Sequence, residues 1–196
     1  VKNALGGDNT VATLFTGIFS VGVATGSIII NRILKGQVSA KFAPASVIAM
    51  GLFVLLLWWI IRGWEAPVIA SHMQASMVSI GDCVVRGESP DLMNWREFLS
   101  TSRGDLIIVA LLGIAIFGGM FVVPLYAFLT TTVSKSQTAR TVAANNIVNS
   151  GAMVLGALLY GGLVSLGVSI ADTLFMIAAA CLVSAWIAQK LHLACD

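Results

Sequence analysis

The 196-residue chain is 58% hydrophobic and only 10% charged, with a mean hydropathy of +0.93. Soluble domains carry about 25% charged residues, so this composition excludes a water-soluble globular protein and predicts a chain solvated by lipid. The net charge of +2 and the absence of a basic run argue against nucleic acid as a partner. The chain starts at Val1 with no signal-peptide pattern before its first apolar stretch, and we expect it to be a segment of a longer protein.

Charge-free apolar windows predict five transmembrane helices, because a helix needs about 20 mostly apolar residues to cross a bilayer. The fifth window is short and gains length by including Ala171 and by letting Lys190 reach the interface. The predicted fold class is therefore an all-α integral membrane bundle. The five predicted spans cover residues 10–31, 44–62, 105–130, 141–165 and 169–190. A large loop, residues 63–104, separates the second span from the third.

Within the large loop, the segment "SPDLMNWREFLS" predicts a short helix. Ser89 is a suitable N-cap and Pro90 a suitable first helical residue. The apolar residues that then share one face are Leu92, Trp95, Phe98 and Leu99. Either this helix lies in the membrane interface with Trp95 at headgroup depth, or the segment is a solvated loop.

Basic residues in the short loops predict the orientation of the chain. The large loop also contains Arg86, Arg96 and Arg103. The two sides therefore differ in the density of basic residues in their loops, and both sides have some. Because alternate loops share a side, we place the N-terminus of the segment outside and its C-terminus in the cytoplasm. The basic residues assigned to the cytoplasmic side are Arg32, Lys35, Lys41, Lys135, Arg140 and Lys190.

Small residues at helical spacing run along three of the predicted helices, and such stripes let helix backbones approach closely. Alternatively, one stripe lines a central cavity of a transporter. In the first helix the stripe is Gly17, Ser20, Ala24, Ser27 and Asn31, beside a separate pair, Gly22 and Gly26. In the fourth helix it is Asn145, Asn149, Ala152 and Gly156. The third helix contains Gly113, Gly118 and Gly119, followed by Pro124, where we expect a kink.

The fourth helix has three asparagines near its start, which is costly in lipid. Asn145 and Asn149 are predicted to face inward, with Asn146 about 100° away and able to bond a neighbouring helix. Interhelical polar contacts are worth only about 0.6 kcal/mol on average, so a hinge latch or a polar cavity wall explains these residues better. The candidate cavity residues are Asn145, Asn149, Asn31, Ser27 and Gly156.

The chain offers little for other kinds of chemistry. No charged residue lies in the middle of a span, which argues against an ion relay in this segment. The cysteines are odd in number, scattered and without C-x-x-C spacing, and the two histidines lie far apart. We therefore expect no metal site, no cofactor and no catalytic residue. The residues concerned are Cys83, Cys181, Cys195, His72 and His192.

Two stretches carry a resemblance to a known family. Residues 117–159, "FGGMFVVPLYAFLTTTVSKSQTARTVAANNIVNSGAMVLGALL", contain a Gly-Gly pair, a Val-Pro-Leu-Tyr helix end and an Arg-x-x-Ala-Ala-Asn-Asn helix start. Residues 26–53, "GSIIINRILKGQVSAKFAPASVIAMGLF", contain a Gly-Ser helix end, a basic loop with glycine and a proline-opened helix. These motifs resemble the major facilitator superfamily, and more narrowly its lysophospholipid-transporter branch. The branch commonly has an acid after the loop glycine where this chain reads "GQVSAKF", so the resemblance does not extend to a charge pair there.

The resemblance implies that the chain is helices 8–12, in the C-terminal half of a transporter of the bacterial inner membrane. The implied partners are membrane lipid and the missing N-terminal half. The implied function is translocation of lysophospholipid for reacylation inside the cell. Arg32, Lys35 and Arg140 would then meet lipid phosphate at the cytoplasmic rim, the alternative being ordinary positive-inside topology.

Two other functions stay open at this point. The same module resembles the front end of a fusion with a glycerophospholipid acyltransferase and an acyl-carrier-protein synthetase, so the chain could serve as the membrane platform of that enzyme. No acyltransferase motif occurs in these 196 residues, and the chain itself is not expected to be an enzyme. It could also be a facilitator for an unrelated small molecule such as a drug or a sugar, since a fold does not fix a substrate.

Overall fold

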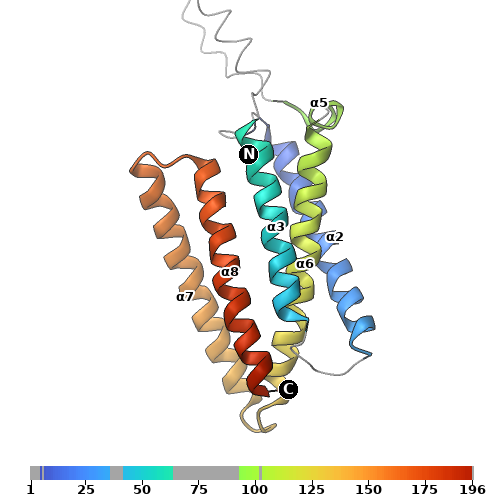
Figure 1. The fold of residues 1–196 in the computed structure, drawn as a ribbon, viewed down its shortest axis with the longest axis vertical. Helices are drawn as coiled ribbons and strands as arrows, with labels where there is room; N and C mark the ends of the chain where they lie inside the picture. The colour runs from blue at the N-terminus through green and yellow to red at the C-terminus, as the bar shows by residue number, and fades with distance from the viewer. Residues whose placement is uncertain (1–4, 6, 36–41, 64–92, 102, 196) are drawn as a thin grey trace, which may run out of the picture.

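The computed structural model describes residues 5, 7–35, 42–63, 93–101 and 103–195. Every regular element within these ranges is a helix, apart from one bridge between Gly7 and Met93. The helices are α2 (Asn9–Ile33), α3 (Ala43–Arg62), α5 (Trp95–Ser100), α6 (Gly104–Thr131), α7 (Thr138–Ser165) and α8 (Ile170–Cys195) (Figure 1).

Five of these helices, α2, α3, α6, α7 and α8, are long and apolar enough to cross a membrane. They coincide with the five predicted spans and extend beyond them by a turn or less, except that α8 continues to Cys195. Figure 1 shows them running roughly alongside one another, with α5 across one end. The all-helical, five-span prediction is confirmed, and the chain has the form of a multi-pass membrane protein.

The start of α2 is fixed by a side-chain cap. Asp8 Oδ1 accepts hydrogen bonds from the backbone N–H groups of Thr10 at 2.8 Å and of Val11 at 3.2 Å. These bonds satisfy two donors that have no partner inside the helix. The Thr10 hydroxyl in turn accepts from the backbone N–H of Trp95 at 3.2 Å, which ties the start of α2 to the start of α5.

Removing this cap is expected to fray the first turn of α2. We expect Asp8→Ala to lower the free energy of unfolding by about 1 kcal/mol, because the two N–H groups lose their acceptor. Asp8→Asn keeps an acceptor oxygen and should recover most of the loss. Unfolding in mixed micelles, followed by tryptophan fluorescence, measures both variants. Equal losses for the alanine and asparagine variants would contradict the cap as the cause.

The short loop helix starts later than predicted. Its N-cap is Asn94, whose extended backbone and side-chain bond to the N–H of Trp95 at 2.7 Å begin the helix there. Glu97 Oε2 accepts from the N–H of Asn94 at 3.2 Å and completes a capping box. Ser89, Pro90 and Leu92 lie outside the described residues. A single helix through the whole segment is not formed, because Met93 is in a bridge with Gly7 and Asn94 is extended.

One face of α5 attaches it to the bundle. Phe98 is fully buried and packs edge-on against Phe15 of α2, with 5.3 Å between ring centroids. Trp95 and Leu99, predicted to share the face of Phe98, stay 39% and 37% exposed. Phe98 therefore anchors this face of α5 in the bundle, while Trp95 and Leu99 remain exposed.

The closest helix contact joins α2 to α6 through glycines. A Cβ atom on Gly26 would collide with the backbone carbonyl of Ile116, and one on Gly119 would lie 2.5 Å from the carbonyl oxygen of Val23. Gly22, the partner of Gly26 in the predicted pair, faces Ala115 in the same seam. Small residues thus let the two backbones touch, as is common in lipid-solvated bundles.

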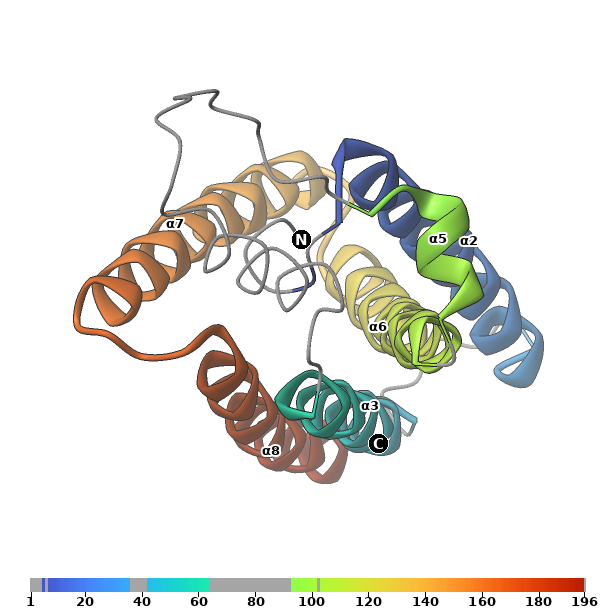
Figure 2. The same ribbon diagram turned by 90° about the horizontal axis from the view of Figure 1, so that it is seen from above.

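The helix α3 lies between α6 and α8 (Figure 2). Against α6, the ring of Phe53 covers Gly113 and stacks on Phe117 with centroids 5.7 Å apart. Against α8, Gly51 faces Cys181, which is buried. Four helices, α2, α6, α3 and α8, therefore form a continuous packed row.

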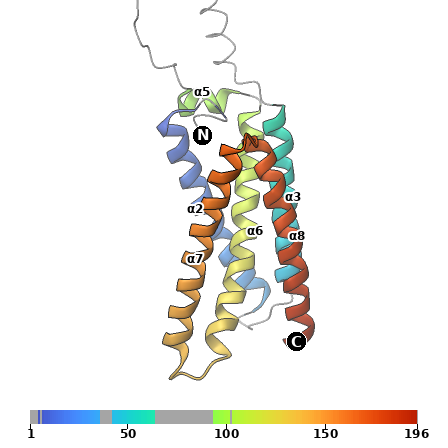
Figure 3. The same ribbon diagram turned by 90° about the vertical axis from the view of Figure 1, so that its left-hand side faces the viewer.

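The helix α7 differs from the others because none of its residues is buried. Side chains such as Ile147 and Leu158 are 73% and 68% exposed. Figure 3 shows α7 joined to α6 at one end of the bundle and to α8 at the other. Gly167, with φ +85°, ends the helix, and the N–H of Val168 bonds the carbonyl of Leu163 at 3.0 Å.

Candidate functional site

A groove of about 470 Å³ lies between the second half of α6 and the first half of α7. It is close to the end of the bundle where these two helices are joined (Figure 1). One wall is apolar and aromatic, and the other carries amides. The residues of the two walls are Phe121, Val122, Leu125, Tyr126 and Leu129 from α6, and Asn145, Asn146 and Asn149 from α7.

The α6 wall is built around a proline. Pro124 is buried, while its neighbours Val122 and Tyr126 are 57% and 42% exposed along the groove. Proline has no N–H, so the carbonyl of Met120 lacks its usual helical donor at this point. The helix nevertheless continues through Pro124 to Thr131. A kink at Pro124 remains an expectation from the sequence.

The α7 wall presents hydrogen-bonding groups that the rest of the described chain does not use. Asn145 is partly buried, and Asn146 and Asn149 are exposed. Among the described residues, no side-chain hydrogen bond links any of the three to another group. Each amide offers two N–H donors and one carbonyl acceptor, and such groups are costly in hydrocarbon without partners. The groove therefore suits a molecule that has polar oxygens next to an apolar chain.

The other predicted cavity residues do not line this groove. Ser27 is partly buried and its hydroxyl donates to the carbonyl of Val23 at 2.8 Å. Asn31 is exposed near the end of α2, and Gly156 is exposed with nothing within 4 Å of a Cβ built on it. Sequence reasoning expected walls from the first, third and fourth spans, whereas the groove takes its lining from the third and fourth.

The predicted phosphate-binding residues are exposed at one end of the bundle but are not gathered. Arg140 lies in the first turn of α7, just over one turn before Asn145. Arg32 and Lys35 lie at the end of α2, which points away from α7 in Figure 2. Among the three, Arg140 is the closest to the groove along the chain, but it does not line the groove and lies about 180° around α7 from Asn149.

Sequence reasoning missed Asn146 and, although it expected a wall from the third span, named none of the residues that form the α6 wall. The helical-wheel argument assigned Asn146 to a neighbouring helix, yet it lines the groove with the other two asparagines. The α6 wall left no periodic signal, because nearly every residue of 106–130 is apolar and no polar face marks the buried side. The Val-Pro-Leu-Tyr motif is the one signal that coincides with this wall.

Comparison of the chain with protein-family models, with curated proteins and with solved structures finds no match. The function is therefore argued from the groove. Within the described residues, no cluster of His, Cys, Asp and Glu is able to hold a metal ion. What the groove offers is an apolar wall and three amides, and pockets of this kind bind ligands through shape and a few placed polar groups.

Proposed function

We propose that the chain is the C-terminal part of a major facilitator superfamily transporter that moves lysophospholipid across the bacterial inner membrane. The observation that carries the proposal is the groove, in which three amides of α7, without a partner among the described residues, face an apolar wall of α6. Residues 117–159, which carry the stronger family resemblance, are also the stretch that builds both walls. The resemblance and the geometry therefore support the same site.

A lysophospholipid has parts that match each side of this groove. Its single acyl chain is compatible with the wall of Phe121, Leu125 and Leu129. Its glycerol hydroxyl and ester oxygens are partners for the amides of α7. Its phosphate is the proposed partner of Arg140, which lies outside the groove lining at the start of α7, since guanidinium groups bind phosphate oxygens through paired hydrogen bonds.

The proposal also accounts for the exposure of α7. A helix with no buried residue, carrying asparagines in a membrane, is expected to face protein or water on at least one side. In the proposed transporter, the missing N-terminal half supplies that surface. The orientation with the groove at the cytoplasmic side follows from the basic loops and belongs to the same proposal.

Uptake of labelled lysophosphatidylethanolamine tests this function. The full-length protein that contains this chain is produced in cells lacking their own lysolipid transporter, and uptake is compared with that of cells carrying an empty vector. We expect uptake above the vector control, reduced by unlabelled lysolipid and unaffected by an unrelated sugar. Uptake equal to the vector control, with the protein present in the membrane, would contradict the proposal.

A further inference from the structure

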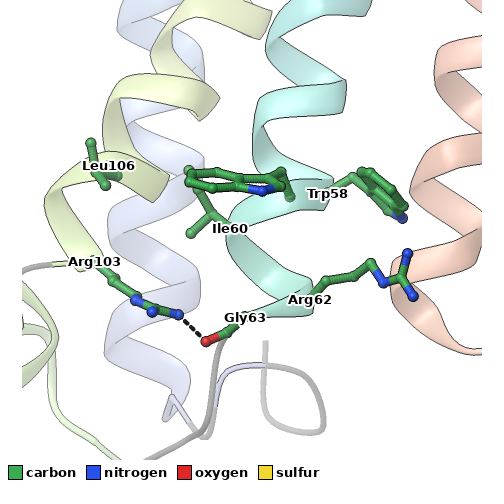
Figure 4. Close-up of a pocket in the computed structure, with 7 residues that line it drawn as sticks. Trp58, Ile60, Arg62, Gly63, Arg103 and Leu106 are labelled. Carbon is green, nitrogen blue, oxygen red and sulfur yellow. Dashed lines mark hydrogen bonds between the residues drawn. The ribbon is translucent and has the colours of Figure 1, made fainter.

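A second pocket, of about 460 Å³, lies at the opposite end of the bundle, where α3 ends and α6 begins (Figure 4). Nothing in the transport proposal uses it. Unlike the groove, its polar groups are mostly cationic and aromatic. The lining residues that matter for its chemistry are Trp58, Trp59, Arg62, Gly63, Arg103 and Leu106.

Two arginines reach this pocket from different segments of the chain. Arg103, which precedes α6, donates from Nη1 to the carbonyl oxygen of Gly63. Arg62, in the last turn of α3, places its guanidinium 5.1 Å from the ring centroid of Trp58. A guanidinium carries five N–H donors, so these contacts leave most of them unused. Within the described residues, no carboxylate pairs with either arginine.

The aromatic part of the pocket is held in place by α8. The ring of Trp58 tilts against Phe175 with 5.6 Å between centroids. Its indole Nε1–H is buried and has no acceptor among the described residues. Trp59 is 67% exposed. The pocket therefore combines donors that lack acceptors among the described residues with tryptophan at an end of the bundle, the position at which tryptophan marks the membrane interface.

Topology does not account for these two cations. The basic loops that set the orientation lie at the other end of the bundle, and arginines at this end run against that bias. A guanidinium group at the border of a low-dielectric medium is costly unless an anion lies beside it. Because the pocket offers cations and donors, it favours a phosphate and disfavours a headgroup that carries an ammonium.

We propose that this pocket binds the headgroup of an anionic phospholipid of the surrounding membrane. Arg62 and Arg103 bind the phosphate oxygens, as guanidinium groups do in paired hydrogen bonds. Trp59 and Leu106 contact the first carbons of the acyl chains. The pocket is separate from the transport groove. The lipid-binding proposal depends only on the bundle spanning a membrane.

Lipid retention measures this binding directly. The protein is extracted into nanodiscs containing equal amounts of phosphatidylglycerol and phosphatidylcholine with the same acyl chains, and the lipids that stay bound are identified by native mass spectrometry. We expect phosphatidylglycerol to be enriched. Each arginine near a membrane surface changes the affinity for anionic lipid by about fivefold, so the double variant Arg62→Gln with Arg103→Gln should lose most of the enrichment.

The chain provides a matched control. Arg96 lies in α5 at the same end of the bundle, with its guanidinium 5.2 Å from the ring centroid of Trp95, and it does not line the pocket. Arg96→Gln is expected to retain the wild-type enrichment. If the double variant does not fold, Arg62→Gln alone carries the test, because it leaves the bond from Arg103 to Gly63 in place and should lower the enrichment about fivefold.

Three results would overturn the proposal. The first is unchanged enrichment in the folded Arg62→Gln or double variant. The second is an equal loss in Arg96→Gln, which would indicate general surface charge. The third is displacement of the lipid by millimolar inorganic phosphate, which would indicate a site for a soluble anion. Since the readout is retained lipid, each of these outcomes is independent of the uptake experiment.

Discussion

Replacing Gly26 with valine is expected to separate α2 from α6 and to lower the free energy of unfolding by about 3 kcal/mol. Gly26 faces the backbone of Ile116, where even a methyl group collides with the carbonyl oxygen. A backbone in a helix cannot rotate away as a side chain can, so the two helices have to move apart. The contact of Gly119 with the backbone of Val23, in the same seam, is lost with them.

The matched control is Gly17→Val in the same helix. Gly17 has nothing within 4 Å of a Cβ atom built on it, so valine there should change the free energy of unfolding by less than about 0.5 kcal/mol. Both variants are measured by unfolding in mixed micelles, followed by circular dichroism. Equal stability of the two variants would show that α2 and α6 do not meet through this seam.

The second large effect is expected at Asn149. In the uptake experiment, Asn149→Leu should lower lysophospholipid uptake by up to about tenfold, because a hydrogen bond between neutral groups contributes about 0.5–1.5 kcal/mol. Its stability should stay within about 0.5 kcal/mol of wild type, since Asn149 is exposed and makes no side-chain hydrogen bond in the described chain. Loss of activity without loss of stability is the signature of a binding residue.

Ser150→Ala is the neighbouring control. Ser150 is exposed on α7 and does not line the groove, so its removal should leave uptake unchanged. Normal uptake by Asn149→Leu would remove the groove from the transport proposal. A similar loss in both variants would point to a general requirement of α7 and would argue against a role for the amide.

The spans were predictable because they depend on local composition alone. A charge-free apolar window of sufficient length has few alternatives to a helix in lipid, and the observed helices follow those windows closely. The start of α5 was not predictable in the same way. It depends on reciprocal bonds between Asn94 and Glu97, and Ser89 and Pro90 were the only start signals considered from the sequence.

The candidate site was predictable only in part. The sequence indicated Asn145 and Asn149 because a polar stripe in an apolar helix is informative by itself. It did not indicate which neighbour the stripe faces, since a helical wheel gives angles within one helix and no partner. Asn31 and Gly156 were included for their spacing. Asn31 lies outside the groove because α2 packs on α6 through a different face, that of Gly22, and Gly156 because it lies about two turns beyond Asn149 along α7.

The way α7 is attached limits how it can move. It is tied at opposite ends of the bundle by two short connections, residues 132–137 and 166–169, and no buried side chain interlocks it with a neighbour. A helix connected at both ends by short segments can tilt little, and rotation about its own axis is the other rigid-body motion open to it. Successive residues differ by about 100° around that axis, so a rotation of this size would exchange Asn145 for Asn146 at one point of the groove wall. No buried side chain of α7 opposes such a rotation, and the packed row of four helices does not include α7.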